Sequence, residues 1–238
     1  MLLGGRNMND CIGVIGAMDA EVKDLISKLE GHSIKTLGGI EFHTGRLFSK
    51  NVVIARCGVG KVFAAMCAQA MIIGFSPRLI VNTGVAGALA EGLDTGDTVI
   101  ASRLVQHDMD TSALGDPKGL ISGINKIYFD ADERAVKILC EEAERLGIKA
   151  IAATVASGDV FVADKLSRER IKETFDASAC EMEGASIAQV AFVNSTPFAV
   201  IRAISDNADG NSAMSFPTFL AAAAKTSQRL TEAIITLY

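Results

Sequence analysis

The chain has 238 residues, of which 49% are hydrophobic and 21% charged, and its 28 acidic and 23 basic residues give a net charge of −5. These values are typical of a globular protein, and they exclude disorder of the whole chain, a collagen-like sequence and a low-complexity sequence. The sequence shows no basic run, no apolar run of about 18 residues and no signal-peptide pattern, so we expect no nucleic-acid partner and no membrane association.

Short apolar runs typical of strands alternate with helical patterns along the chain. Such alternation predicts an α/β fold with a mainly parallel sheet covered on both faces. In these folds ligands bind at the carboxyl ends of the strands. In chain order, the predicted elements are strand 11–16, helix 19–29, an antiparallel meander of strands 34–39, 40–47 and 51–57, helix 61–73, strand 79–82, a Gly-rich segment at 83–87, strand 97–105, helix 131–146, strands 150–156 and 179–182, helix 183–193, strand 198–204 and helix 215–237.

Domain organisation and redox state follow from what the sequence lacks. Without a repeat or a Pro/Ser-rich linker, residues 11–238 are predicted to form a single domain, preceded by a disordered leader at residues 1–10. The odd number of cysteines, none in a CxxC pair, is typical of a reduced chain, so we expect a cytoplasmic protein. His32, His43 and His107 are isolated, so no metal and no cofactor is expected.

One Gly-rich segment superficially resembles a phosphate-binding loop. The P-loop pattern requires a Gly five residues before the Gly-Lys pair and a Ser or Thr after the Lys. Around Gly60-Lys61 these two positions are Ala55 and Val62, so a P-loop is excluded. The chain also has no GxSxG or HExxH sequence, and no GxGxxG follows the first strand, which argues against a dehydrogenase.

Polar clusters interrupt the apolar strand ends at residues 16–21, 157–161, 181–184 and 202–206. Taken singly, each has a structural explanation: Glu21 and Glu183 can complement helix dipoles, and Asp206 can form a turn. Taken together, three carboxylates and Arg202 are predicted at one edge of one sheet. Burial of carboxylates is costly unless they are paired or used. The clusters therefore predict a site that binds a flat, apolar, hydroxyl-bearing molecule and moves protons.

The segments IGVIGAMDAEV, GVGKV, NTGVAGAL, SGDVF, EMEGA and RAISD follow one another in this order. Together, from residue 12 to about residue 237, they resemble the 5′-methylthioadenosine/S-adenosylhomocysteine nucleosidases of the nucleoside phosphorylase superfamily. The resemblance implies a three-layer α/β/α sandwich with a central mixed sheet, and a homodimer. It also implies hydrolysis of the N-glycosidic bond of these two nucleosides, which releases adenine and a 5′-thioribose in methionine salvage and the recycling of S-adenosylmethionine by-products.

The same resemblance implies catalytic roles for four residues. Glu21 matches the general base for the attacking water, and Arg202 would hold that water or the carboxylates. Glu183 matches the acid that binds the ribose hydroxyls and stabilises an oxocarbenium-like state. Asp206 matches the acid that delivers a proton to adenine N7.

Substrate-binding roles follow in the same way. Phe161 matches the ring that stacks on adenine, and the backbone of Val162 matches the purine hydrogen-bonding edge. Met182 would pack against the ribose, and Ser205 would orient the acid or contact the base. The apolar lining around the 5′-alkylthio group is matched by Met18, Val59 and Phe216.

Val85 departs from the family pattern. The fourth residue of the NTGSAG motif is often Ser, placed near the water, and the valine side chain cannot form a hydrogen bond. Either the backbone does this work, or Glu21 and Arg202 hold the water alone.

Several alternatives remain at this stage. A phosphorolytic enzyme needs Arg near the first strand-to-helix turn, but no Arg lies between Ile12 and Phe42, and Asp19 and Glu21 stand at the turn. We therefore expect water as the nucleophile, with phosphorolysis as the alternative. A non-catalytic nucleoside-binding protein, and futalosine-type or AMP-type nucleosidases, share the superfamily. The order of preference among methylthioadenosine, S-adenosylhomocysteine, 5′-deoxyadenosine and aminofutalosine stays open.

Two segments carry further expectations. Residues 106–128 contain apolar side chains with few helical signals, and by resemblance this segment and the helix from Lys61 form the subunit contact. Residues 207–215, NADGNSAMS, are predicted to be a gating loop that closes over the ligand, with Ser215 as the N-cap of the last helix.

Overall fold

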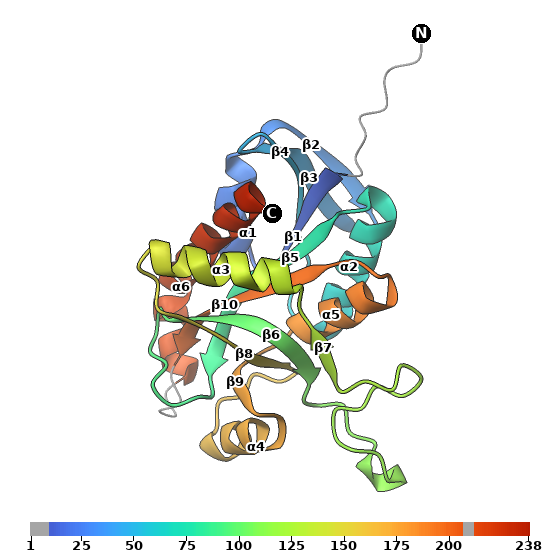
Figure 1. Ribbon diagram of the computed structural model, residues 1–238, viewed down its shortest axis with the longest axis vertical. Coiled ribbons are helices and arrows are strands. Elements are labelled where there is room, and N and C mark those ends of the chain that lie inside the picture. Colours follow the sequence, from blue (N-terminus) through green and yellow to red (C-terminus); the bar gives the residue numbers. More distant parts are fainter. Residues whose placement is uncertain (1–9, 207–211) are drawn as a thin grey trace.

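The computed structural model describes residues 10–206 and 212–238, with backbone only for 212–218. Over this part of the chain, ten strands form a mixed sheet flanked by six α-helices (Figure 1). The strands are β1 (Cys11–Gly16), β2 (Glu30–Leu37), β3 (Ile40–Leu47), β4 (Lys50–Arg56), β5 (Leu79–Ala88), β6 (Thr98–Gln106), β7 (Tyr128–Asp130), β8 (Ala150–Ser157), β9 (Ala177–Glu181) and β10 (Phe198–Asp206). The helices are α1 (Asp19–Ser27), α2 (Lys61–Phe75), α3 (Glu133–Arg145), α4 (Lys165–Phe175), α5 (Gly184–Val193) and α6 (Ser212–Leu237).

The sheet closes partly on itself. The central strand β5 pairs in parallel with β1 and β10 and, near its end, antiparallel with β9. Strands β10, β6, β8, β9 and β5 thus form a closed circuit of pairings, while β1, β4, β3 and β2 extend from β5 as an open wing. Because five of the ten pairings are antiparallel, the expected mainly parallel sheet is wrong and the mixed sheet is confirmed.

Helices cover both faces of the sheet, which confirms the layered α/β architecture (Figure 1). One core forms beneath α2 and α5, with Met71 and Ile187 fully buried against β1 and β8. A second core forms beneath α1, α3 and α6, with Leu25, Leu139 and Ile234 fully buried. The α4 helix packs apart from the other helices, against β8 and β9. No helix in the described part of the chain has the length and apolar character needed to cross a membrane.

Two predicted assignments need correction. The Gly-rich segment 83–87 is the second half of β5, because its backbone pairs with β10 along its length. The last helix begins at Ser212, so Ser215 lies inside it; residues 212–215, Ser-Ala-Met-Ser, contain no helix breaker. Of the predicted gating loop at 207–215, residues 207–211 lie outside the described residues, and residues 212–215 belong to α6. The α4 helix and the short strand β7 were not predicted.

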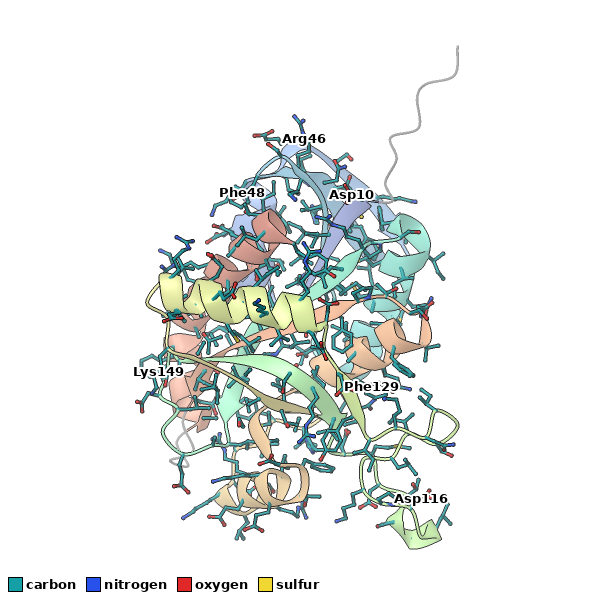
Figure 2. The ribbon with its side chains drawn as sticks, in the orientation of Figure 1. Asp10, Arg46, Phe48, Asp116, Phe129 and Lys149 are labelled. Carbon is teal, nitrogen blue, oxygen red and sulfur yellow. The ribbon has the colours of Figure 1, made fainter. Side chains whose placement is uncertain are left out.

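The segment between β6 and β7 projects away from the body of the molecule, and Figure 2 shows Asp116 near its tip. Its regular structure is confined to the 3₁₀ turn Ser112–Leu114 and an isolated bridge between Ile121 and Lys126. This agrees with the few helical signals in its sequence.

Candidate active site

A cavity of about 220 Å³ opens where β1, β5 and β10 end and β9 meets them. The three predicted carboxylates, Glu21, Glu183 and Asp206, all line it. Arg202 does not line the cavity, and the side chain of Phe216 lies outside the described residues. The lining residues are Ala17, Met18, Glu21, Val59, Val85, Ala86, Gly87, Val160, Phe161, Val162, Cys180, Glu181, Met182, Glu183, Ser205 and Asp206.

Glu21 is held by backbone amides at the start of α1. Its Oε2 accepts hydrogen bonds from the N–H groups of Ala17 (2.7 Å) and Met18 (2.9 Å), and its Oε1 accepts one from Val85 N–H (3.3 Å) across β5. A Cβ at Gly84 would lie 2.7 Å from Oε1, so a larger residue there would displace the Glu21 carboxylate from this position. Burial raises the pKa of Glu21, although Arg202 and these amides oppose the rise.

Glu183 stands at the N-cap of α5 and faces the start of α2. Its Oε1 accepts a hydrogen bond of 2.8 Å from the N–H of Gly60, whose φ of 101° favours glycine. The segment that superficially resembles a phosphate loop thus binds a carboxylate of the chain itself. Burial, reinforced by the charge of Glu181, raises the pKa of Glu183 from 4.5 to about 7, although Arg202 opposes the rise.

Glu181 is a buried part of the site that sequence reasoning did not assign a role. It forms an ion pair with Arg202, accepts a hydrogen bond from the Ser157 hydroxyl, and accepts others from Glu183 N–H (3.0 Å) and Gly184 N–H (2.8 Å). Burial opposes its ionisation, but Arg202 and these donors hold the pKa of Glu181 below its usual range. The position of Glu181 within EMEGA was the available signal.

Arg202 holds a carboxylate and lies behind the residues that line the cavity. Its guanidinium is 2% exposed, pairs with Glu181, and donates to the side-chain and backbone oxygens of Asn82. Of the two roles expected for Arg202, the geometry favours support of the carboxylates from behind the cavity wall.

Asp206 is the last residue of β10, and each of its two carboxylate oxygens accepts a hydrogen bond from a side chain. Oδ1 lies 3.0 Å from the Ser205 hydroxyl, and Oδ2 lies 2.6 Å from Nη2 of Arg168. A Cβ at Gly87 would lie 3.1 Å from Oδ2, so a larger residue there would crowd the acid.

The buried charges do not balance within the described residues. Four carboxylates are buried there, and two guanidinium groups are buried with them. Arg202 pairs with Glu181, and Arg168 pairs with Asp206. Glu21 and Glu183 are left with amide donors in place of a cation. Burial raises the pKa of both groups, and neither has a directly paired cation that would offset the rise in full.

Comparisons with known proteins agree with this geometry. The sequence profile of the phosphorylase superfamily matches residues 11–236. The 5′-methylthioadenosine/S-adenosylhomocysteine nucleosidase of Shewanella halifaxensis is 38% identical over 226 residues, covering 94% of this chain and 98% of that protein. The chain belongs to this nucleosidase family, whose members are purine nucleoside N-glycosidases.

Two solved structures have the same fold as this nucleosidase. The nucleosidase of Neisseria meningitidis, in complex with methylthio-immucillin-A, superposes with a TM-score of 0.93 at 33% identity, covering 96% of this chain and 100% of that one. The futalosine hydrolase of Helicobacter pylori superposes with a TM-score of 0.92 at 35% identity, covering 97% of this chain and 99% of that one.

Val85 and Phe161 show how the nucleosidase shapes the cavity wall. Val85 is 8% exposed, and its backbone N–H donates a hydrogen bond to the carboxylate of Glu21. Phe161 is 47% exposed at the cavity mouth, beside the buried Val162. An aromatic ring in this position can cover a flat base once one enters.

Proposed function

We propose that this cytoplasmic nucleosidase hydrolyses the N-glycosidic bond of 5′-methylthioadenosine and S-adenosylhomocysteine. The products are adenine and a 5′-thioribose, as required for methionine salvage and the recycling of S-adenosylmethionine by-products. The observation that carries this proposal is the convergence of Glu21, Glu183 and Asp206 on one cavity with an otherwise largely apolar lining.

Each carboxylate has a step suited to its surroundings. Glu21, fixed by three backbone amides, accepts a proton from the attacking water as that water approaches the anomeric carbon. Glu183 accepts hydrogen bonds from ribose hydroxyls, and its charge stabilises the cationic sugar. Asp206 acts in its protonated form: its carboxylic acid gives its proton to N7, the C–N bond breaks, adenine leaves as a neutral base, and Asp206 is left as a carboxylate.

The apolar lining supports a thioether at the 5′ end. Met18, Val59, Val85 and Met182 contribute apolar surface to the cavity. A methylthio or homocysteinyl group gains from burial of its apolar atoms at roughly 25 cal/mol per Å². An anionic 5′-phosphate would lie near the buried carboxylates, which disfavours an AMP-type substrate.

Aminofutalosine is the second candidate substrate. It shares the adenosine moiety and differs in its tail at the 5′ position. The likeness to the futalosine hydrolase of Helicobacter pylori, at 35% identity over 97% of this chain, is as strong as the likeness to the nucleosidase structure named above. The three carboxylates act on the adenosine moiety that the substrates share, so they do not discriminate between aminofutalosine and the 5′-thioadenosines.

A substrate panel tests the proposal. We expect the purified protein to release adenine from methylthioadenosine and S-adenosylhomocysteine at equal rates with and without phosphate. A kcat/KM for aminofutalosine that exceeds both by tenfold or more would assign the second candidate instead. A phosphate requirement would establish phosphorolysis, and nucleoside binding without adenine release would establish a binding protein.

The raised pKa of Glu183 predicts a pH profile. Glu183 must be ionised to accept ribose hydroxyls, and the ionised fraction falls as the pH drops through about 7. We therefore expect kcat/KM to fall about tenfold per pH unit below 7, and more steeply where Glu21 also gains a proton. Because folding raises this pKa from 4.5, the folded chain binds more protons than the unfolded chain between pH 4.5 and 7, so the free energy of unfolding decreases as pH rises across that interval. A kcat/KM that stays flat from pH 5 to 8 would contradict the assignment.

We further propose that the nucleosidase is a homodimer. Val62, Phe63 and Ile73 on α2 expose 70%, 54% and 76% of their surface, and Leu114 on the projecting segment exposes 83%. An apolar helix face of this kind is typical of a subunit contact. By resemblance, part of the segment 106–128 closes the 5′ pocket of the neighbouring subunit.

The dimer is tested by light scattering with a charged substitution. Wild-type protein is expected at twice the chain mass, and Val62→Asp at the chain mass, because a buried unpaired carboxylate disfavours association. Phe48→Asp is the matched control, since Phe48 is 48% exposed and lies far from Asp116 in Figure 2. A fully active wild-type monomer would overturn the proposal.

A further inference from the structure

Arg168 is a buried cation to which neither the sequence patterns nor the proposed chemistry assigns a role. It lies in the first turn of α4 and is 3% exposed, although its neighbours Glu169 and Arg170 are exposed. Together with Ile171 and Phe175 it forms the buried face of this helix. A buried arginine is tolerated only when its donors find acceptors.

The guanidinium of Arg168 reaches three separate parts of the site. Nη2 pairs with Asp206 Oδ2 at 2.6 Å, at the end of β10. Nη1 donates to the backbone oxygen of Ala88 at 3.1 Å, at the end of β5. Nε donates to the backbone oxygen of Val162 at 3.2 Å, in the segment that carries Phe161. Because a guanidinium is planar and its donors have fixed directions, these contacts together fix where Asp206 can lie.

We propose that Arg168 is a positioning residue for the proton donor: it holds the Asp206 carboxyl at the purine end of the cavity and ties it to the segment that recognises the base. The proposal rests on the proposed function, because it takes N7 of a purine as the partner of Asp206. The Ser205 hydroxyl steadies Oδ1. Arg168 holds Oδ2 and also binds the Val162 carbonyl oxygen, so the carboxyl of Asp206 keeps a fixed position relative to the Val162 backbone. Proton transfer depends steeply on such placement.

A pair of non-cleavable ligands measures the placement of Asp206 without catalysis. In 9-deaza-5′-methylthioadenosine N7 carries a hydrogen and can donate to Asp206. In 7-deaza-5′-methylthioadenosine a C–H group replaces N7 and forms no such bond. The ratio of their dissociation constants therefore reports the contact between N7 and Asp206. We expect the 9-deaza ligand to bind wild-type protein about ten- to a hundredfold more tightly, the usual scale for a hydrogen bond to a charged group.

Arg168→Met is expected to reduce this ratio to within threefold of unity, while the 7-deaza ligand keeps its wild-type affinity. Arg168→Lys keeps the buried charge but cannot span all three oxygens, so it is expected to reduce the ratio as well, and it remains informative if the methionine variant fails to fold. Arg170→Met, which removes an exposed arginine from the same helix, is the matched control and should leave the ratio unchanged. A ratio that stays constant or rises when Arg168 is replaced would overturn the proposal.

Kinetics separate positioning from a general structural role. Arg168→Met should lower kcat for methylthioadenosine about ten- to a hundredfold with KM within threefold, but should lower it less than threefold when Asp206→Asn is already present. Equal losses in both backgrounds would show that Arg168 only stabilises the fold. If the wild-type protein releases no adenine, the proposed function fails, whereas normal release with an unchanged ligand ratio refutes the role of Arg168 alone.

Discussion

Glu21→Gln is expected to lower kcat for methylthioadenosine by two orders of magnitude or more, while the affinity for a non-cleavable analogue stays within about threefold. The amide keeps the size of the side chain, but it cannot take a proton from water, and loss of a general base has this scale. Three backbone N–H groups donate to the carboxylate of Glu21. The glutamine side chain has one oxygen that can accept such hydrogen bonds and one NH₂ group that cannot, so the variant keeps only part of them. Initial rates of adenine release and calorimetric binding measure the two quantities.

Asp19→Asn provides the matched control for this substitution. Asp19 is an acid in the first turn of the same helix, but its side chain is 76% exposed and pairs with Arg56 at the surface. Its replacement should change kcat by less than threefold. A Glu21→Gln enzyme that retains more than a tenth of the wild-type rate would assign the activation of water to another group.

The sequence pattern predicted the three carboxylates that line the cavity, because they lie near the ends of apolar strands. Glu21 lies in the first turn of α1, which follows β1, and Asp206 ends β10; both strands pair in parallel with β5. Their carboxyl ends therefore meet at the same edge, as the strand pattern predicted. Glu183 reaches this edge differently, because β9 runs antiparallel to the end of β5. The sequence pattern predicted the antiparallel meander of β2, β3 and β4, which is confirmed, but it did not predict the antiparallel pairings of β6 and β9.

The residues that were missed are those whose function depends on burial. Arg168 lies among charged residues and looks like part of a solvated helix, yet Arg168, Ile171 and Phe175 recur at the spacing of one helical face. Gly84 was placed in a Gly-rich segment after the strand, although it lies in β5, where its lack of a side chain leaves room for the Glu21 carboxylate. Glu181 was overlooked because only tertiary contacts distinguish it from Glu183 two residues later.

Arg202→Met is expected to lower the free energy of unfolding by about 3–5 kcal/mol at pH 8, the scale for removing one partner of a buried ion pair. The substitution leaves Glu181 buried without its cation and removes the charge that opposes the raised pKa values of Glu21 and Glu183. Chemical denaturation measures the loss. Glu181→Gln combined with Arg202→Met is the control, and it should recover part of the loss because neither charge is then left alone.

The pH dependence of this loss distinguishes charge from packing. With Arg202 absent, the buried carboxylates gain protons at higher pH than in the wild-type protein, because the cation no longer favours their ionised forms. Protonation at pH 5 therefore removes much of the uncompensated charge, and the loss of stability should be smaller at pH 5 than at pH 8. For the same reason the acid limb of kcat/KM should move to higher pH in any Arg202→Met enzyme that folds. Packing that is lost when methionine replaces the longer arginine side chain does not depend on pH. An equal loss of stability at both pH values would therefore show that the charge of Arg202 is not what stabilises the site.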